Sequence, residues 1–148
     1  MLQSFRVLFW LSLLSAYHCS AQADHITISD LWISEAPPVA KIHAGYMTIT
    51  NSSDDEIILK KIVSPDYAKI EMHRSVVIDD RMKMEAHRQI IIPPKQTFRF
   101  QPGDYHLMLF GPKNRWLAGD EITLTFQFDE HLQFSLSAPV RKRKSLEK

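Results

Sequence analysis

The chain has 148 residues, with 18 Lys and Arg against 17 Asp and Glu, which gives a formal net charge of +1. This length suits one domain with its own core, and the near-balanced charge does not indicate a nucleic-acid partner. Only 4 glycines are present and they form no phosphate-binding motif, which excludes the P-loop class of nucleotide-binding proteins.

The first 23 residues have the layout of a secretory signal peptide. Arg6 precedes an apolar stretch from Val7 to Ala16, and the small-residue site Ala21-Gln22-Ala23 follows. The apolar stretch is shorter than the roughly 20 residues that a membrane-spanning helix needs. We therefore predict that residues 1–23 are a signal peptide cleaved near Ala23, and that the exported protein has no stable membrane anchor.

Cys19 permits a second interpretation, in which the exported chain is lipid-anchored. The residue before it is His18, whereas lipoprotein processing sites have a small side chain at that position, so we favour cleavage after Ala23. The mature chain, residues 24–148, then contains no cysteine. Its fold must depend on a hydrophobic core without disulfides.

The rest of the chain is predicted to form β-strands, because apolar and β-branched residues alternate with polar ones. The segments with this alternation are 25–34, 43–50, 56–63, 97–100, 105–110, 121–128 and 132–137. Turn-forming residues such as Asp79-Asp80 and Pro102-Gly103-Asp104 lie between them, and no window shows a helical apolar stripe. We therefore predict one all-β domain, a sandwich or a barrel, over residues 24–139.

Residues 140–148 form a basic tail that contains Arg141-Lys142-Arg143-Lys144. A basic run of this kind can contact an anionic membrane or nucleic acid, but chain ends are more often simply solvated. We predict a disordered tail and no nucleic-acid partner.

Methionine and histidine are concentrated in three short pieces: Met72-His73, Met82-Lys83-Met84 and His106-Leu107-Met108. Residues two apart on a strand share a face, so His106 and Met108 project together while Leu107 points into the core. A strand that ends at His73, a turn, and a return through Met84 bring a second imidazole and thioether nearby. Each piece alone is better explained by gap-filling methionines and half-exposed histidines. Their convergence is what indicates a shared metal ion.

The combination of imidazole and thioether donors favours cuprous copper. Thioether sulfur is soft and suits Cu(I), whereas zinc prefers thiolate, imidazole and carboxylate, and calcium and magnesium prefer oxygen. A blue-copper centre is excluded, because it needs a thiolate that the mature chain lacks. A neutral ligand set without thiolate suits a site that binds the ion and later releases it. Imidazole protonation competes with the metal, so binding should weaken below about pH 6.

The order and spacing of these residues resemble the PCu(A)C-type periplasmic copper chaperones. His73, Met84, His106 and Met108 match the H-x10-M-x21-H-x-M signature of that family. Three flanking segments are also similar to its strands: AGYMTITN (44–51), PGDYHLML (102–109) and GDEITLTF (119–126). The resemblance covers nearly the whole mature chain.

The resemblance implies a cupredoxin-like or immunoglobulin-like β-sandwich that carries one Cu(I) per chain on His73, Met84, His106 and Met108. It also implies a periplasmic chaperone that delivers the ion to the copper centres of cytochrome c oxidase. Copper-accepting oxidase subunits and Sco-type thiol proteins are the implied partners. The tail contains neither His nor Met, so no second copper site is expected, and we expect a monomer.

Several residues near the expected site are left outside the ligand set. Met72 would point away from the first histidine on a regular strand, Met82 shares the face of the second ligand and is a spare donor, and His87 is left out. Glu71 has the strand parity to orient the first histidine ring. Asp104 stands where the family commonly has glycine, so the turn before Tyr105 is expected to differ slightly.

No nucleophile with a plausible base is visible, and we predict that the chain is not an enzyme. The alternatives are a copper storage or resistance protein, and an extracellular ligand-binding β-sandwich in which the Met and His residues are incidental. A small copper-dependent enzyme is a third.

Overall fold

A computed structural model of the chain describes residues 25–129 and 132–142, which form β-strands and no α-helix. Among these residues no helix has the length and apolarity to cross a bilayer. The expected signal peptide, residues 1–23, and residues 143–148 of the expected tail lie outside the described residues. The strands are β1 (Ile26–Ser34), β2 (Ile42–Asn51), β3 (Ile57–Leu59), β4 (Lys61–Val63), β5 (Tyr67–Ile78), β6 (Arg81–His87), β7 (Ile90–Ile92), β8 (Thr97–Phe100), β9 (Tyr105–Pro112), β10 (Glu121–Gln127) and β11 (Gln133–Arg141).

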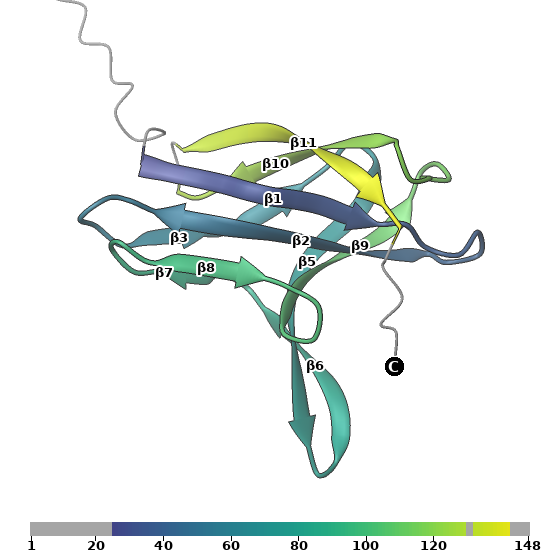
Figure 1. Cartoon of the computed structure of the whole chain (residues 1–148), viewed down its shortest axis with the longest axis horizontal. Coiled ribbons are helices and arrows are strands. Elements are labelled where there is room, and N and C mark those ends of the chain that lie inside the picture. The colour runs from purple at the N-terminus through teal and green to yellow at the C-terminus, as the bar shows by residue number, and fades with distance from the viewer. Residues whose placement is uncertain (1–24, 130–131, 143–148) are drawn as a thin grey trace, which may run out of the picture.

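The strands form two layers that are joined at β1 (Figure 1). One layer contains β1, β2, β8, β9, β5 and β6, in which β2 pairs with β8 over one half and with β9 over the other. The second layer contains β4, β10 and β11, and β11 runs parallel to the end of β1, where Ile33 pairs with Val140. β3 and β7 form a separate two-stranded ribbon. The predicted all-β sandwich with a single domain is confirmed.

The core lies between the layers and follows from the alternation in the sequence. In β10 every second residue is buried, and Ile122, Leu124 and Phe126 are all 0% exposed. In β9, Leu107 and Leu109 are 0% exposed in the core, whereas His106, which is 7% exposed, and Met108 point to the other face, as period-two alternation predicts. The core therefore fixes which face of β9 is left for other chemistry.

The segment expected as one strand over 56–63 is instead two strands, and that expectation was wrong. Leu59 and Ile62 are both buried, although they are three residues apart and cannot share a face of one regular strand. The strand is interrupted at Lys60. Leu59 pairs with Ile90 of β7, and Ile62 pairs with Phe126 of β10.

The domain also extends beyond the expected boundary at residue 139. β11 continues to Arg141, and Val140 is only 2% exposed because it packs in the core and pairs with β1. Residues 140 and 141 therefore belong to the sandwich and not to the tail.

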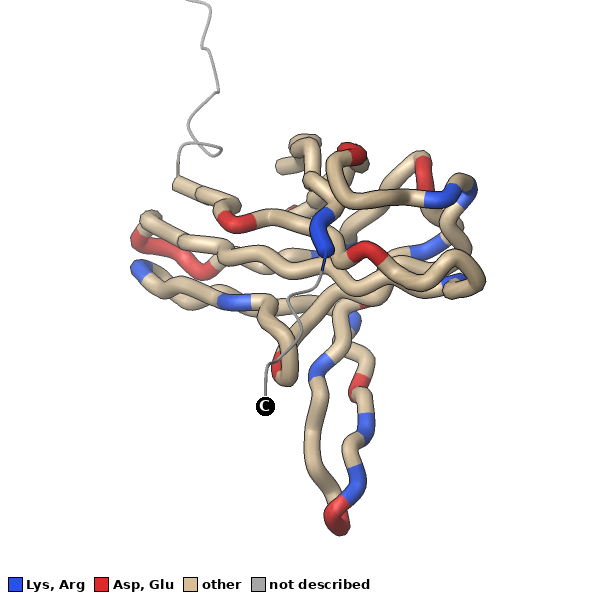
Figure 2. Tube along the Cα trace, turned by 45° about the vertical axis from the view of Figure 1, so that its right-hand side comes forward, with Lys and Arg blue, Asp and Glu red and all other residues tan. Residues whose placement is uncertain are grey.

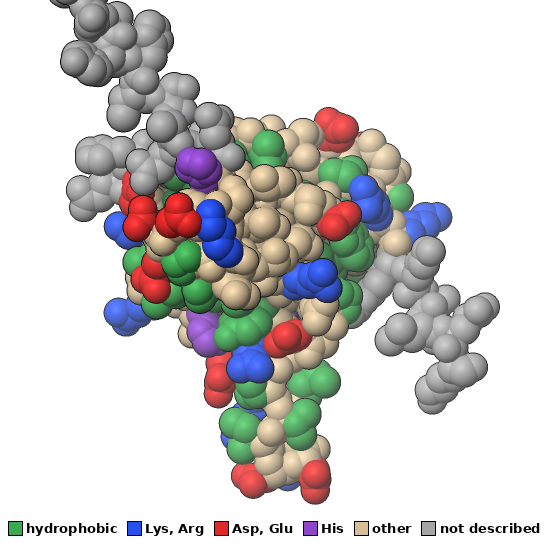
Figure 3. All heavy atoms as spheres, turned by 60° about the vertical axis from the view of Figure 1, so that its left-hand side comes forward, with side chains coloured by type: hydrophobic (Ala, Val, Ile, Leu, Met, Phe, Trp, Pro, Cys, Tyr) green, Lys and Arg blue, Asp and Glu red, His purple; other side chains and the backbone are tan. Residues whose placement is uncertain are grey.

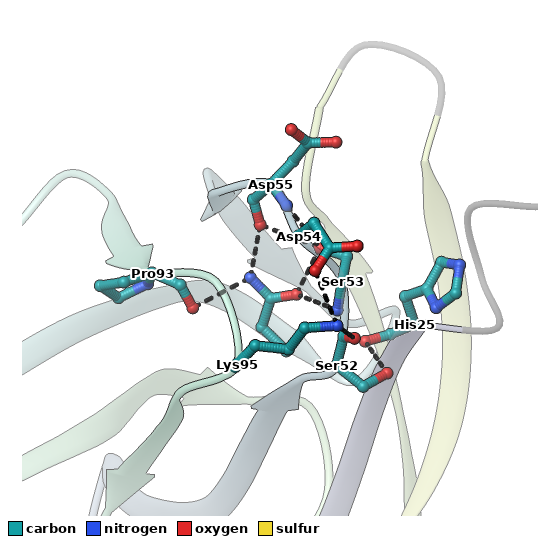
Figure 4. A network of polar contacts seen from close by, with 8 residues as sticks. His25, Ser52, Ser53, Asp54, Asp55, Pro93 and Lys95 are labelled. Atoms are coloured by element: carbon teal, nitrogen blue, oxygen red, sulfur yellow. Dashed lines mark hydrogen bonds and ion pairs between the residues drawn. The ribbon is translucent and has the colours of Figure 1, made fainter.

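One end of β2 is fastened by the buried side chain of Asn51. Figure 4 shows three of the residues that it contacts, Ser53, Asp55 and Pro93. Its Nδ2 lies 2.8 Å from the carbonyl oxygen of Asp55 and 3.1 Å from those of Ile92 and Pro93. Its Oδ1 accepts hydrogen bonds from the amide and hydroxyl of Ser53, at 3.0 and 2.6 Å. This network ties the loop after β2 to the end of β7, at the end of β2 that is remote from its pairing with β9.

The hairpin of β5 and β6 projects from the sandwich (Figure 1). β5 does not end at His73, as the sequence suggested, but continues to Ile78. The turn residues Asp79 and Asp80 both have positive φ angles, 52° and 57°, as a two-residue type I′ turn requires. Figure 2 shows acidic residues at the tip of the hairpin and basic residues along it.

Candidate metal site

The four residues expected as metal ligands lie on three neighbouring strands, β6, β5 and β9. His73 of β5 is directly opposite His106 of β9. Met108 is opposite Glu71, and Met84 of β6 is opposite Ser75.

Strand parity puts all four side chains on one face of this layer. Glu71, His73 and Ser75 alternate along β5, and each of the other three expected ligands is paired with one of them. Residues that are diagonal across two antiparallel strands are about 7–8 Å apart at the backbone, within reach of long side chains. The structure therefore brings the four residues together around His73.

Small side chains complete the surroundings of this face. Ala86 of β6 is opposite His73, and Ala44 of β2 is opposite Met108. Because neither carries atoms beyond Cβ, the space above the face is left to the imidazole and thioether groups.

The ring of His73 is held by a carboxylate. Its Nε2 lies 2.9 Å from Oε2 of Glu71, and Oε1 of the same carboxylate is 2.6 Å from Nζ of Lys69. The hydrogen bond from Lys69, and next that from His73, hold the pKa of the Glu71 carboxyl below its ordinary value. The carboxylate accepts the proton on Nε2, so the lone pair of the neutral ring is on Nδ1. This Nδ1 is buried and has no hydrogen-bond partner.

The ring of His106 is held by the backbone. Its Nδ1 lies 2.9 Å from the carbonyl oxygen of Asp104, which also accepts the amide of Ser75 at 3.2 Å. A carbonyl can only accept, so Nδ1 carries the proton and the lone pair is on Nε2. The centroids of the His73 and His106 rings are 6.2 Å apart and their planes are tilted by 38°. Each imidazole thus has one nitrogen fixed by an acceptor and one lone pair for a ligand.

The side chain of Asp104 also anchors the turn before β9. Its Oδ1 lies 3.1 Å from Nε of Arg74, and the Arg74 guanidinium stands 5.1 Å from the centroid of the Tyr105 ring. The preceding residue, Gly103, has a φ of +86°, which glycine adopts without strain. Spacing gave no indication of the Arg74–Asp104 ion pair, because it depends on how β5 and β9 are aligned.

The methionines near the site differ in exposure. Met84 is 54% exposed and Met108 is half-buried, whereas Met72 is 5% exposed and packs in the core, pointing away from the histidines as expected. Met82 is 68% exposed and is opposite Val77, on the same face as Met84.

His87 does not join the four residues. It is opposite Met72, hence on the other face of the layer, and its ring centroid is 5.1 Å from that of Tyr105. In the described part of the chain, no three His, Cys, Asp or Glu side chains are grouped to hold a metal ion.

Comparison with known proteins matches the chain to a family described as putative lipoproteins. A family model described as "LpqE-like: Putative lipoprotein LpqE-like" matches residues 26–140. A relative from Leifsonia xyli subsp. xyli, described as "Putative lipoprotein Lxx21020", is 27% identical over 128 residues, which cover 86% of this chain and 76% of the relative.

Two solved structures with a similar fold are described as copper-bound or as a Cu(I) form. The copper-bound PCuAC domain from PmoF2 superimposes with a TM-score of 0.68 at 21% identity, over 80% of this chain and 94% of that domain. The solution structure of CuI-DR1885 from Deinococcus radiodurans gives a TM-score of 0.60 at 25% identity, over 80% of this chain and 78% of the other. The expected resemblance to PCu(A)C-type domains is therefore supported at the level of the fold.

Proposed function

The chain belongs to the LpqE-like family, and on that premise we propose that it is an exported protein that binds one Cu(I) and passes it on. The proposed ligands are His73, Met84, His106 and Met108. The chain is proposed to be a carrier rather than an enzyme.

The observation that carries this proposal is the state of the two imidazoles. Each donates one N–H to a protein acceptor, and Nδ1 of His73 is a buried lone pair that no protein group uses. An unpartnered buried polar atom is costly unless a ligand satisfies it. Two thioethers, Met84 and Met108, flank the ring pair on the same face.

The donor atoms determine which ion binds and how readily it is released. Imidazole and thioether are neutral and suit Cu(I), and the absence of a thiolate among the proposed ligands favours release to a protein that binds more tightly. The copper-bound and CuI forms of similarly folded domains support the same assignment.

We further propose the destination implied by the sequence. The chain is proposed to act in the periplasm as a monomer and to deliver copper to the copper centres of cytochrome c oxidase, with Sco-type thiol proteins as co-workers. Copper storage or resistance is the alternative. Transfer from loaded protein to apo-oxidase domains separates the two, since a storage protein would keep its ion in their presence.

Whether the exported chain carries a lipid is a separate question from which metal it binds. Cleavage near Ala23 leaves a mature chain without lipid, whereas the description of the family as lipoproteins favours acylation of Cys19. The mass of the exported chain distinguishes a start at Asp24 from an acylated start at Cys19.

The ligands are tested by Cu(I) titration of the exported chain under reducing conditions. We expect one equivalent to bind with mixed sulfur and nitrogen coordination in X-ray absorption. Met84→Ala and Met108→Ala should each weaken binding by about tenfold or more, which corresponds to about 1.4 kcal/mol. Met47→Leu, in the core on β2, is the control that removes a thioether elsewhere and should bind as the parent does. Equal affinity in all three variants would exclude the proposed site.

A further inference from the structure

The two faces of the β5–β6 hairpin have opposite character beyond the proposed site. On the face of His73, the residues toward the tip are uncharged: Ser75, Val77, Met82 and Met84. The other face carries the charged residues of the two strands, together with Val76 and Ile78: Arg74, Arg81, Lys83 and Glu85.

The uncharged face is exposed, with side chains that would normally be buried. Val77 is 70% exposed, Met82 68% and Met84 54%, whereas the core methionine Met47 is 1% exposed. Hydrophobic side chains gather along this projection (Figure 3). Because their apolar area stays in water, these side chains contribute little to the stability of the fold.

Exposure increases in steps from the proposed site toward the tip. The side chain of His73 is 12% exposed, Met84 is 54% exposed, and Met82, two residues nearer the tip on β6, is 68% exposed. Met82 and Met84 are i and i+2 on one strand, so their side chains start about 7 Å apart and point the same way. Methionine is long, unbranched and flexible, so two thioethers at this spacing can reach one ion.

We propose that Met82 is a transfer ligand for Cu(I), in addition to the four ligands of the proposed function on which this inference rests. The ion is first held by the thioethers of Met82 and Met84 at the exposed hairpin. It then moves inward as Nδ1 of His73 and the donors of β9 replace the sulfur of Met82. Release follows the same steps in reverse.

The chemistry of this exchange is balanced. Each step replaces one neutral donor by another, so the ion stays Cu(I) and no electron is moved. In the neutral rings, the hydrogen bonds to Glu71 and Asp104 leave one lone pair each on His73 and His106 to bind the ion. The exposed thioether lowers the barrier because the ion is never without a soft donor.

The test is the rate at which the loaded, exported chain gives Cu(I) to excess bicinchoninate. Met82→Leu keeps the apolar volume and removes the sulfur, and it should slow release about tenfold, equivalent to about 1.4 kcal/mol in the barrier. Val77→Leu, opposite Met82 on the same face, is the matched control and should release copper at the parent rate. A slow Met82→Ala with a normal Met82→Leu would show that the apolar surface matters and not the sulfur, and would overturn the proposal.

A second readout does not depend on transfer. With Ag(I) as a redox-inert stand-in, the ε-methyl NMR signal of Met82 should shift during titration together with that of Met84. An unmoved Met82 signal and a parent release rate in Met82→Leu would exclude this role. If the parent chain binds no Cu(I), the proposed function itself fails, which is a different result.

Discussion

The two histidines of the proposed site are fixed by different kinds of acceptor. His106 is held by a main-chain carbonyl, which no substitution removes, while His73 is held by the Glu71 side chain. Carboxylates that accept the second N–H of a metal-binding histidine orient the ring and raise its basicity. Glu71 is therefore a positioning residue that can be tested without touching a proposed ligand.

Replacing Glu71 should weaken Cu(I) binding. Loss of a group that orients a ligand typically costs 10- to 100-fold in metal affinity, so we expect about tenfold for Glu71→Ala. The loss should be smaller for Glu71→Gln, whose amide oxygen still accepts the His73 proton. The 15N shifts of His73 should report a changed tautomer in Glu71→Ala alone. Glu85→Gln, an exposed carboxylate on the opposite face of the hairpin, is the control, and an unchanged affinity in Glu71→Ala would contradict the assignment.

Strand parity could be predicted from the sequence, but strand register could not. Alternation alone predicted that Leu107 and Leu109 are buried and that Met72 points away from the histidines, and the structure agrees. The direct opposition of His73 and His106, and the Arg74–Asp104 ion pair, depend on how β5 and β9 are aligned. The loops between these strands set that alignment, and no residue spacing encodes it.

Short strands were the least predictable elements. β7 consists of Ile90–Ile92, three identical residues with no alternation to reveal a strand. β3 and β4 were expected to be one strand over 56–63, although Lys60 and Lys61 interrupt its apolar residues. The three-residue spacing of buried Leu59 and Ile62 was the signal that a single strand could not bury both. β5 is longer than expected, and its outer half, near Val77, is exposed and has no core to face.

The turn at the tip of the β5–β6 hairpin holds two aspartates in a left-handed conformation. Non-glycine residues at such φ values are strained by about 1 kcal/mol or more. Asp80→Gly should therefore stabilise the hairpin, whereas Asp80→Ala should destabilise it, because Ala lacks the local hydrogen bonding that lets Asp adopt positive φ. Hydrogen exchange of the hairpin amides should slow in the first variant and accelerate in the second. Equal exchange in both would show that the turn does not control the hairpin.

In the molecule as a whole, the proposed site and the stabilising core are separate. The core lies between the layers, while the proposed ligands lie on the opposite face of β5 and β9 and on a hairpin that projects from the sandwich. Truncating an exposed side chain such as Met84 should therefore leave stability within about 0.5 kcal/mol. This separation is what makes binding variants interpretable without loss of the fold.

The stability of the metal-free protein should depend on a histidine in the interior. His43 of β2 is 5% exposed, and its ring centroid is 5.7 Å from that of Tyr67. Burial lowers the pKa of His43, and burial followed by the charge of Asp66 raises the pKa of Tyr67. Tyr67 therefore stays neutral over the acidic range, and of these two residues only His43 can change charge there.

The sign of the effect follows from proton uptake. An unfolded histidine titrates near 6.5, so below that pH the unfolded chain binds a proton that folded His43 resists. The free energy of unfolding should fall as pH decreases from 6.5, by at most about 2 kcal/mol at pH 5, since one pKa unit is worth 1.36 kcal/mol. The lowered pKa of Glu71 also contributes to the free energy of unfolding, but this contribution is lost only at a more acidic pH, below about 4.3.

Urea unfolding of the metal-free chain at pH 7.5 and 5 measures this dependence, and His43→Phe provides the comparison. Phenylalanine keeps an aromatic contact to Tyr67 and cannot take up a proton, so the variant should lose less stability between the two pH values than the parent. An equal loss in both chains would assign the acid sensitivity to other groups. Because the measurement is made without copper, competition between protons and metal at the proposed ligands cannot contribute to it.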